Sequence, residues 1–75
     1  MEASGLTEKQ GEVLRYIDMY VKKHGGRVPT LAEIATGAGV YSASNVRGVL
    51  RGLEERGYIR RLPNRARAIE IIRMP

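Results

Sequence analysis

The feature that most constrains the fold of this chain is a change in hydrophobic period at Gly57. Before this glycine, apolar residues recur every three or four positions in three separate segments, which is the period of an α-helix. After it, residues 58–62 and 68–72 are short runs rich in β-forming residues, which predict two strands. Because the chain has only 75 residues, we expect one small domain, 1–75, built from three helices and a hairpin.

Capping signals and glycines set the expected ends of the helices. The predicted N-terminal caps are Thr7 with Gln10, Thr30 with Glu33, and either Ser42 or Ser44. Glycines at 25–26, at 37–39 and at 57 are expected to end the three helices. A short extended piece, Arg27–Val28, is predicted as a strand before Pro29.

The order of these elements predicts the fold class. Two capped helices joined by a short glycine-containing turn are typical of a helix-turn-helix, and a basic hairpin after the second helix makes it a winged helix-turn-helix. We therefore expect a mainly α fold with a small antiparallel hairpin, a loose N-terminus at residues 1–5 and a wing tip at residues 63–67. The isoleucines predicted to face inward are Ile59, Ile69 and Ile71.

The excess positive charge of the chain is confined to its C-terminal part. Residues 1–46 carry five basic and five acidic side chains, whereas residues 47–75 carry eight arginines and three glutamates, so the whole excess of +5 lies there. Arginine presents a planar fork of donors that suits phosphates and guanine edges. This pattern favours double-stranded DNA as the partner, with an ordinary solvated surface as the alternative.

Neither catalysis nor metal binding is expected. The chain has no cysteine and one histidine, which excludes thiolate sites and the familiar zinc ligand sets. We also find no phosphate-binding glycine loop and no nucleophile beside a base, so we expect no enzyme activity and no cofactor. Because no apolar run approaches ~20 residues and no signal peptide is present, a cytoplasmic location without membrane contact is predicted.

The third helix carries the predicted reading surface. If the apolar stripe within residues 46–53 faces the core, the polar residues on the opposite side of the helix face outward. Serine, asparagine and arginine are side chains that pair with bases in a major groove. The predicted base-reading residues are Ser44, Asn45, Arg47 and Gly48. The predicted phosphate or wing contacts are Thr30, Tyr41, Arg51, Arg65 and Arg67. Thr30 fits a plain N-cap equally well, Arg65 and Arg67 also fit a solvated turn, and Gly52 is expected to pack against another helix.

Several segments resemble the DNA-binding domain of LexA repressors. Leu6–Leu14 resembles the opening helix of that domain, and Val28–Ala35 is similar to the family's P-T-x-x-E-I-A segment. Ser42–Gly57, followed by Tyr58 and Ile59, corresponds to the recognition helix and the start of the wing. The resemblance covers about residues 6–72, and it implies a winged helix-turn-helix, operator binding as a two-fold dimer and a transcriptional repressor of the SOS type.

By position, the resemblance places the family's base-reading residues on Ser42, Ser44, Asn45, Arg47 and Gly48. At the last four of these positions the family typically carries Asn, Ala, Glu and Glu. Because this chain differs at all four, we do not expect it to recognise the family's operator sequence. LexA repressors also continue into a self-cleaving peptidase domain that dimerises them, which this chain is expected to lack. As an excised domain or a stand-alone small regulator, the chain would need a homodimer on DNA or a partner protein for useful affinity.

A second function remains open from the sequence. Winged helices also act as protein–protein interaction modules, here in a phage, defence or replication complex. A continuous positive face formed by the arginines at 47, 51, 65 and 67 would favour DNA, and scattered arginines would favour a protein partner. RNA is a weaker candidate because the hairpin has no aromatic residues on which bases stack.

Overall fold

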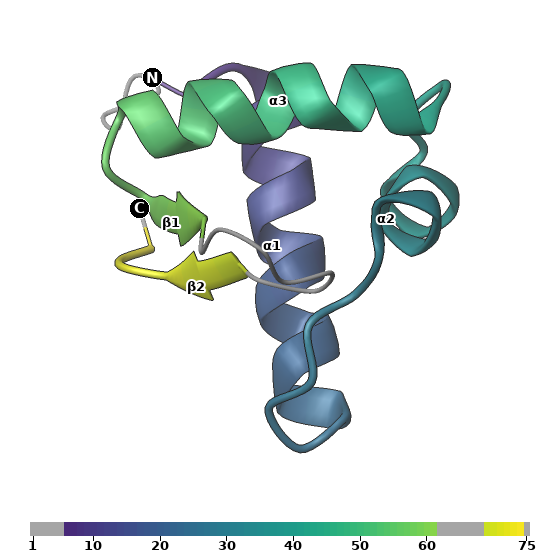
Figure 1. Ribbon diagram of the computed structural model, residues 1–75, viewed down its shortest axis with the longest axis vertical. Coiled ribbons are helices and arrows are strands. Elements are labelled where there is room, and N and C mark those ends of the chain that lie inside the picture. The colour runs from purple at the N-terminus through teal and green to yellow at the C-terminus, as the bar shows by residue number, and fades with distance from the viewer. Residues whose placement is uncertain (1–5, 62–68, 75) are drawn as a thin grey trace.

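The computed structural model describes residues 6–61 and 69–74 of the chain. Its elements in chain order are α1 (Glu8–Lys23), α2 (Leu31–Ala38), α3 (Ala43–Glu55), β1 (Ile59–Arg61) and β2 (Ile69–Ile71). Figure 1 shows α3 lying across one end of α1, with α2 on one side of α1 and the two strands on the other. Three helices and an antiparallel strand pair in this order form a winged helix-turn-helix, as predicted. The predictions for residues 1–5 and 63–67 lie outside the described residues.

The helices begin at the predicted caps. Thr7 and Thr30 each form a complete capping box, in which the threonine side chain accepts a backbone N–H three residues on and that residue's side chain accepts the N–H of the threonine. Of the two serines proposed for α3, Ser42 is the cap: its Oγ accepts the Asn45 N–H at 3.2 Å. Ser44 therefore lies inside the first turn of α3, where its side chain is exposed.

Glycines end α2 and α3, also as predicted. Gly39 has a φ of 71° at the end of α2, and Gly57 has a φ of 81° after α3. Both values lie in the left-handed region, which glycine adopts at little cost. The turn between α2 and α3 is short, and Val40 within it is buried in the core. This anchoring fixes how α3 is held against α2.

The core lies where the three helices meet β1. Its buried members are Leu6, Val13, Leu14, Ile17, Ile34, Val40, Val46, Leu50, Leu53, Tyr58 and Ile59. Ile69 and Ile71 are half-buried against the same cluster, which confirms the predicted inward positions. The predicted packing of Gly52 is also confirmed, because a Cβ there would overlap the side-chain amide of Gln10 on α1.

The strand prediction was correct for the hairpin and wrong for the segment before α2. Ile59 pairs with Ile71 and Arg60 with Glu70 in an antiparallel ladder. Within the described residues the sheet has only these two strands, so Arg27–Val28 is not a third. The sequence signal was Pro29, which biases the residue before it toward an extended backbone, and that bias alone does not make a strand.

Candidate nucleic-acid interface

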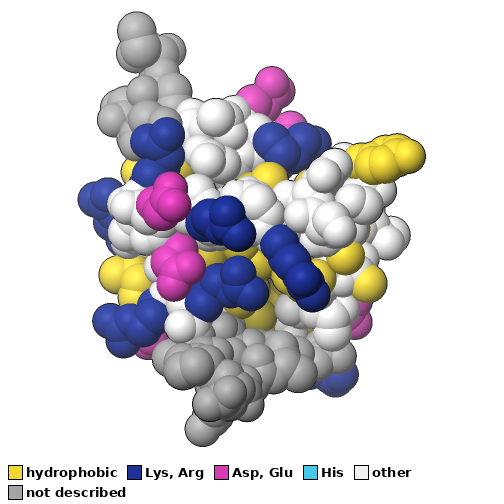
Figure 2. Space-filling model, turned by 45° about the horizontal axis from the view of Figure 1, so that its top comes forward, with side chains coloured by type: hydrophobic (Ala, Val, Ile, Leu, Met, Phe, Trp, Pro, Cys, Tyr) yellow, Lys and Arg dark blue, Asp and Glu magenta, His cyan; other side chains and the backbone are white. Residues whose placement is uncertain are grey.

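Helix α3 exposes a polar face because its apolar face is buried. Val46, Leu50 and Leu53 are fully buried, which fixes the rotation of the helix about its axis. The exposed residues then include Ser44, Asn45, Arg47, Gly48 and Arg51. Figure 2, in which the α3 end of the molecule is turned toward the viewer, shows Lys and Arg side chains gathered across the middle of this face. Every residue predicted to read bases from α3 is therefore at the surface.

Arg47 and Arg51 lie one helical turn apart, and neither has an ion-pair partner among the described residues. The ion pairs in that part of the chain join Lys9 to Glu12, Lys22 to Asp18 and Arg60 to Glu70. Two like charges at this spacing destabilise a helix by a few tenths of a kcal/mol, roughly 0.2–0.5. Their placement does nothing for the stability of α3, and both guanidinium groups are free to bind an anion.

Two other arginines of the C-terminal excess are used within the fold. The Nη1 of Arg60 lies 3.3 Å from Oε1 of Glu70, its cross-strand neighbour. The guanidinium of Arg73 lies 4.5 Å from the centre of the Tyr58 ring and donates a hydrogen bond to the carbonyl of Arg56. Of the arginines in the C-terminal excess, Arg60 and Arg73 thus make contacts within the fold, whereas Arg47 and Arg51 on α3 have no ion-pair partner among the described residues.

Gly48 is a glycine that the packing of the chain does not require. A Cβ built at this position would meet no atom within 4 Å, and its φ is not in the left-handed region. A glycine inside a helix lowers its stability by about 1 kcal/mol relative to alanine. This open surface is compatible with the predicted role of Gly48 among the base-reading residues, which stays a prediction.

The turn before α3 presents two further predicted contacts. Tyr41 is 93% exposed, the highest value among the large hydrophobic side chains of the described residues. Ser42 is half-buried, and its Oγ already accepts the Asn45 N–H. A serine hydroxyl can accept one bond and donate another, so capping leaves the Ser42 hydrogen available to a base or phosphate.

Thr30 acts as the N-cap of α2. Its backbone N–H donates to Oε1 of Glu33 at 2.7 Å, and the same oxygen accepts the Tyr20 hydroxyl at 3.3 Å. The Glu33 carboxylate thus already occupies the positive end of the α2 dipole. The plain N-cap role is confirmed, and a phosphate contact by Thr30 stays a prediction. The wing contacts predicted at Arg65 and Arg67 lie outside the described residues.

The remaining polar groups were compared with the requirements of a metal site. Within residues 6–61 and 69–74, no three His, Cys, Asp or Glu side chains are grouped so that they could hold a metal ion. His24 is exposed and stacks on the ring of Tyr20, with the ring centroids 4.0 Å apart. This stacking was not predicted, although the i,i+4 spacing of the two residues on α1 was visible in the sequence.

In the described part of the chain, no helix combines the length and apolar character needed to cross a bilayer.

Comparison with known families identifies a DNA-binding domain. The model of the LexA DNA binding domain matches residues 3–68. This range contains α1, α2, α3 and β1, and with them all the residues predicted to read bases.

Proposed function

Because the chain belongs to the family of LexA DNA-binding domains, we propose that it binds double-stranded DNA sequence-specifically in transcriptional regulation, as a LexA-like repressor. The observation that carries the proposal is the exposed pair Arg47 and Arg51. Both lie on a helix whose opposite face is locked in the core, and neither has an ion-pair partner in the described part of the chain. A rigid helix with unpaired arginines is suited to a major groove.

In this proposal the N-terminal half of α3 reads the bases. Asn45 pairs with adenine and Arg47 with guanine, the contacts that their donor and acceptor geometry favours, and Ser44 contacts either a base or a phosphate. Gly48 lets the helix backbone approach closely. Arg51 lies one turn further along and contacts a phosphate. The two glutamates at 54–55 would repel phosphates, so the C-terminal end of α3 tilts away from the DNA.

The neighbouring elements supply backbone contacts. Tyr41 contacts the DNA backbone and Thr30 a phosphate, while Arg65 and Arg67 contact phosphates or the adjacent minor groove. Ser42, at the entrance of the groove, adds its hydroxyl to the base-reading residues. A single module of this kind buries roughly 600–1,000 Å² on DNA. Useful affinity therefore requires two copies on a two-fold operator or a partner protein, and we propose the homodimer.

Selection from a random duplex library, followed by titration of the enriched sequence, tests this function. We expect one enriched half-site, repeated at a spacing of about one helical turn of DNA or a multiple of it. Arg47→Ala should relax the preference at one base pair, at a cost of about 1–3 kcal/mol on the preferred sequence. Arg51→Ala should weaken all sequences alike and reduce the log–log salt slope by about 0.9. If no duplex is enriched, DNA reading is wrong and the protein-interaction function takes its place.

A further inference from the structure

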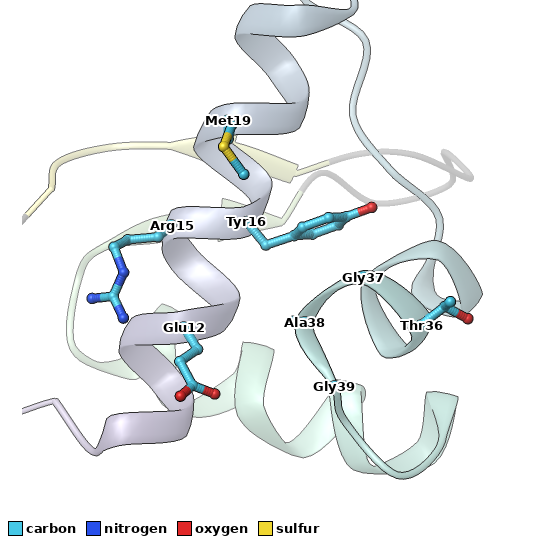
Figure 3. A pocket seen from close by; sticks show the side chains of 8 residues that line it. All are labelled: Glu12, Arg15, Tyr16, Met19, Thr36, Gly37, Ala38 and Gly39. Atoms are coloured by element: carbon cyan, nitrogen blue, oxygen red, sulfur yellow. The ribbon is translucent and has the colours of Figure 1, made fainter.

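A second surface feature lies between α1 and α2. It is a hollow of about 690 Å³, lined by Glu12, Arg15, Tyr16, Met19, Thr36, Gly37, Ala38 and Gly39 (Figure 3). Smaller hollows continue it along α1, past Tyr20 to Lys23 and His24. We call this combined surface the α1–α2 groove. No residue of α3 and none of the predicted DNA contacts lines it, so DNA on α3 and a ligand in the groove use different residues.

The floor of the groove is apolar and accessible. Met19 is 63% exposed although it is a large hydrophobic residue. Beside it lie the rings of Tyr16 and Tyr20, with centroids 6.0 Å apart, and in Figure 3 the ring of Tyr16 points toward α2. Methionine is flexible and polarisable, which suits it to contact with apolar side chains of a partner. Small residues on α2 leave the opposite wall smooth.

Three contacts hold the two walls of the groove in place. Nζ of Lys9 bonds to Oε1 of Glu12 at 3.0 Å and donates to the carbonyl of Gly39 at 3.4 Å, which joins α1 to the end of α2. Toward the start of α2, the Tyr20 hydroxyl bonds to Glu33. Between these two hydrogen-bonded ends, α2 passes so close to Tyr16 that a Cβ at Gly37 would overlap the tyrosine ring. A groove already formed in this way needs little ordering when it binds a ligand.

The charges around the groove are asymmetric. Its acidic groups have partners, since Glu12 pairs with Lys9 and the Glu33 carboxylate accepts two hydrogen bonds. The bases Arg15 and Lys23, by contrast, have no ion-pair partner within the described residues. They lie eight residues apart on α1, which is about 12 Å along the helix axis. The groove is thus an apolar strip with Lys23 toward one end, while toward the other Arg15 borders its outer rim, its side chain leaving α1 on the side away from α2 (Figure 3).

We propose that the α1–α2 groove binds an acidic amphipathic helix of a partner protein. Apolar side chains of that helix pack against Met19 and the Tyr16 ring, and its carboxylates bind Arg15 and Lys23. Because positions 15 and 23 are offset by about 12 Å along the axis of α1, we expect the partner helix to carry acidic residues seven or eight positions apart with apolar residues midway between them. This inference does not depend on DNA binding, because the two surfaces share no residue.

A display library of random 16-residue peptides, selected on the intact chain without DNA, tests the proposal. Peptides that also bind the Met19→Glu variant are removed, because this exposed substitution should repel an acidic partner without disturbing the core. We expect the enriched peptides to carry acidic residues seven or eight positions apart around an apolar centre. Amide chemical-shift changes on titrating the best peptide should fall on residues 12–24 and 32–39, not on α3.

A pair of matched double variants separates this groove from general attraction to a positive protein. Arg15→Ala/Lys23→Ala should weaken the selected peptide about tenfold or more, whereas Lys22→Ala/Arg27→Ala, which removes the same charge outside the groove, should change it less than about threefold. Equal losses in the two variants would overturn the proposal, as would shift changes on α3. Failure to enrich any peptide that discriminates against Met19→Glu would also overturn it. A further outcome would also overturn the proposal: amide chemical shifts of the groove that change with protein concentration in the absence of peptide, and that no longer change in the Met19→Glu variant. Such shifts would show that a second copy of the chain binds the groove.

Discussion

Replacing Gly48 with alanine should raise the stability of the chain and lower its affinity for DNA. The position lies in the middle of α3, and a Cβ there would meet no atom within 4 Å. The substitution therefore gains helix propensity without steric cost, about 1 kcal/mol in the free energy of unfolding. For a domain of this size that corresponds to a rise in Tm of roughly 4–8 °C, measured by circular dichroism.

The same methyl group points toward the DNA in the proposed complex. If the backbone at Gly48 approaches the bases, the added methyl holds the whole helix away and lengthens the contacts of Arg47 and Asn45. We expect a loss of about tenfold in affinity for the selected duplex, which equals about 1.4 kcal/mol, measured by fluorescence anisotropy. Stability and binding then change in opposite directions, so misfolding cannot explain the loss.

Gly11→Ala is the matched control. Gly11 lies in α1, and a Cβ there would contact only the side chain of Arg15, which can move. This variant should gain stability without any change in DNA affinity. If Gly48→Ala is stabilised yet binds the duplex as tightly as the original chain, Gly48 does not face DNA. If it is destabilised, the account of α3 as an unobstructed helix at this position is refuted.

Three further predictions concern the fold and its pH dependence. Gly37→Ala should lower the free energy of unfolding by about 1–3 kcal/mol in urea titrations, because its Cβ overlaps the Tyr16 ring; an unchanged midpoint would refute that packing. Ser42→Ala should cost about 1 kcal/mol as a lost N-cap, whereas Ser44→Ala should stay within about 0.5; equal effects would contradict the assignment of the cap. Partial burial, with smaller contributions from Tyr20 and Glu33, raises the pKa of Tyr16 above its ordinary value of about 10. Because the pKa of Tyr16 is higher in the folded state than in the unfolded state, its contribution to the free energy of unfolding is complete below pH ~10 and is lost as the pH rises through the folded-state pKa. Above pH ~10, the urea midpoint of Tyr16→Phe, which cannot ionise at this position, should therefore fall less than that of the original chain.

The helices were predictable because their signals are local. A threonine three residues before Gln10 or Glu33 specifies a capping box, and Gly39 and Gly57 specify left-handed ends, all within a few neighbouring residues. The choice between Ser42 and Ser44 was not local, because both suit an N-cap; it depends on where buried Val40 and Val46 hold the chain. The strand expected at Arg27–Val28 was not a local question either, because strand pairing depends on which other segment lies alongside, and the described ladder joins only β1 and β2.

The candidate interface was predictable only in part. The exposed face of α3 followed from its apolar stripe, because burying that stripe leaves one orientation for Arg47 and Arg51. The use of Arg60 and Arg73 within the fold did not follow, since their partners Glu70 and Tyr58 come from other elements. The α1–α2 groove was missed altogether. Its walls meet only through tertiary contacts, and nothing in the sequence around Tyr16 and Tyr20 shows which part of α2 lies beside them.

The central claim is that α3 reads double-stranded DNA with its unpaired arginines. The most direct test is the affinity of the intact chain for the selected duplex and for an unrelated duplex, each measured at several salt concentrations. We predict affinity that falls with salt, with a log–log slope of about −0.9 for each phosphate neutralised, and binding of the selected duplex at least about 10³-fold tighter than the unrelated one. Affinity that ignores salt, or equal affinity for the two duplexes, would contradict the account.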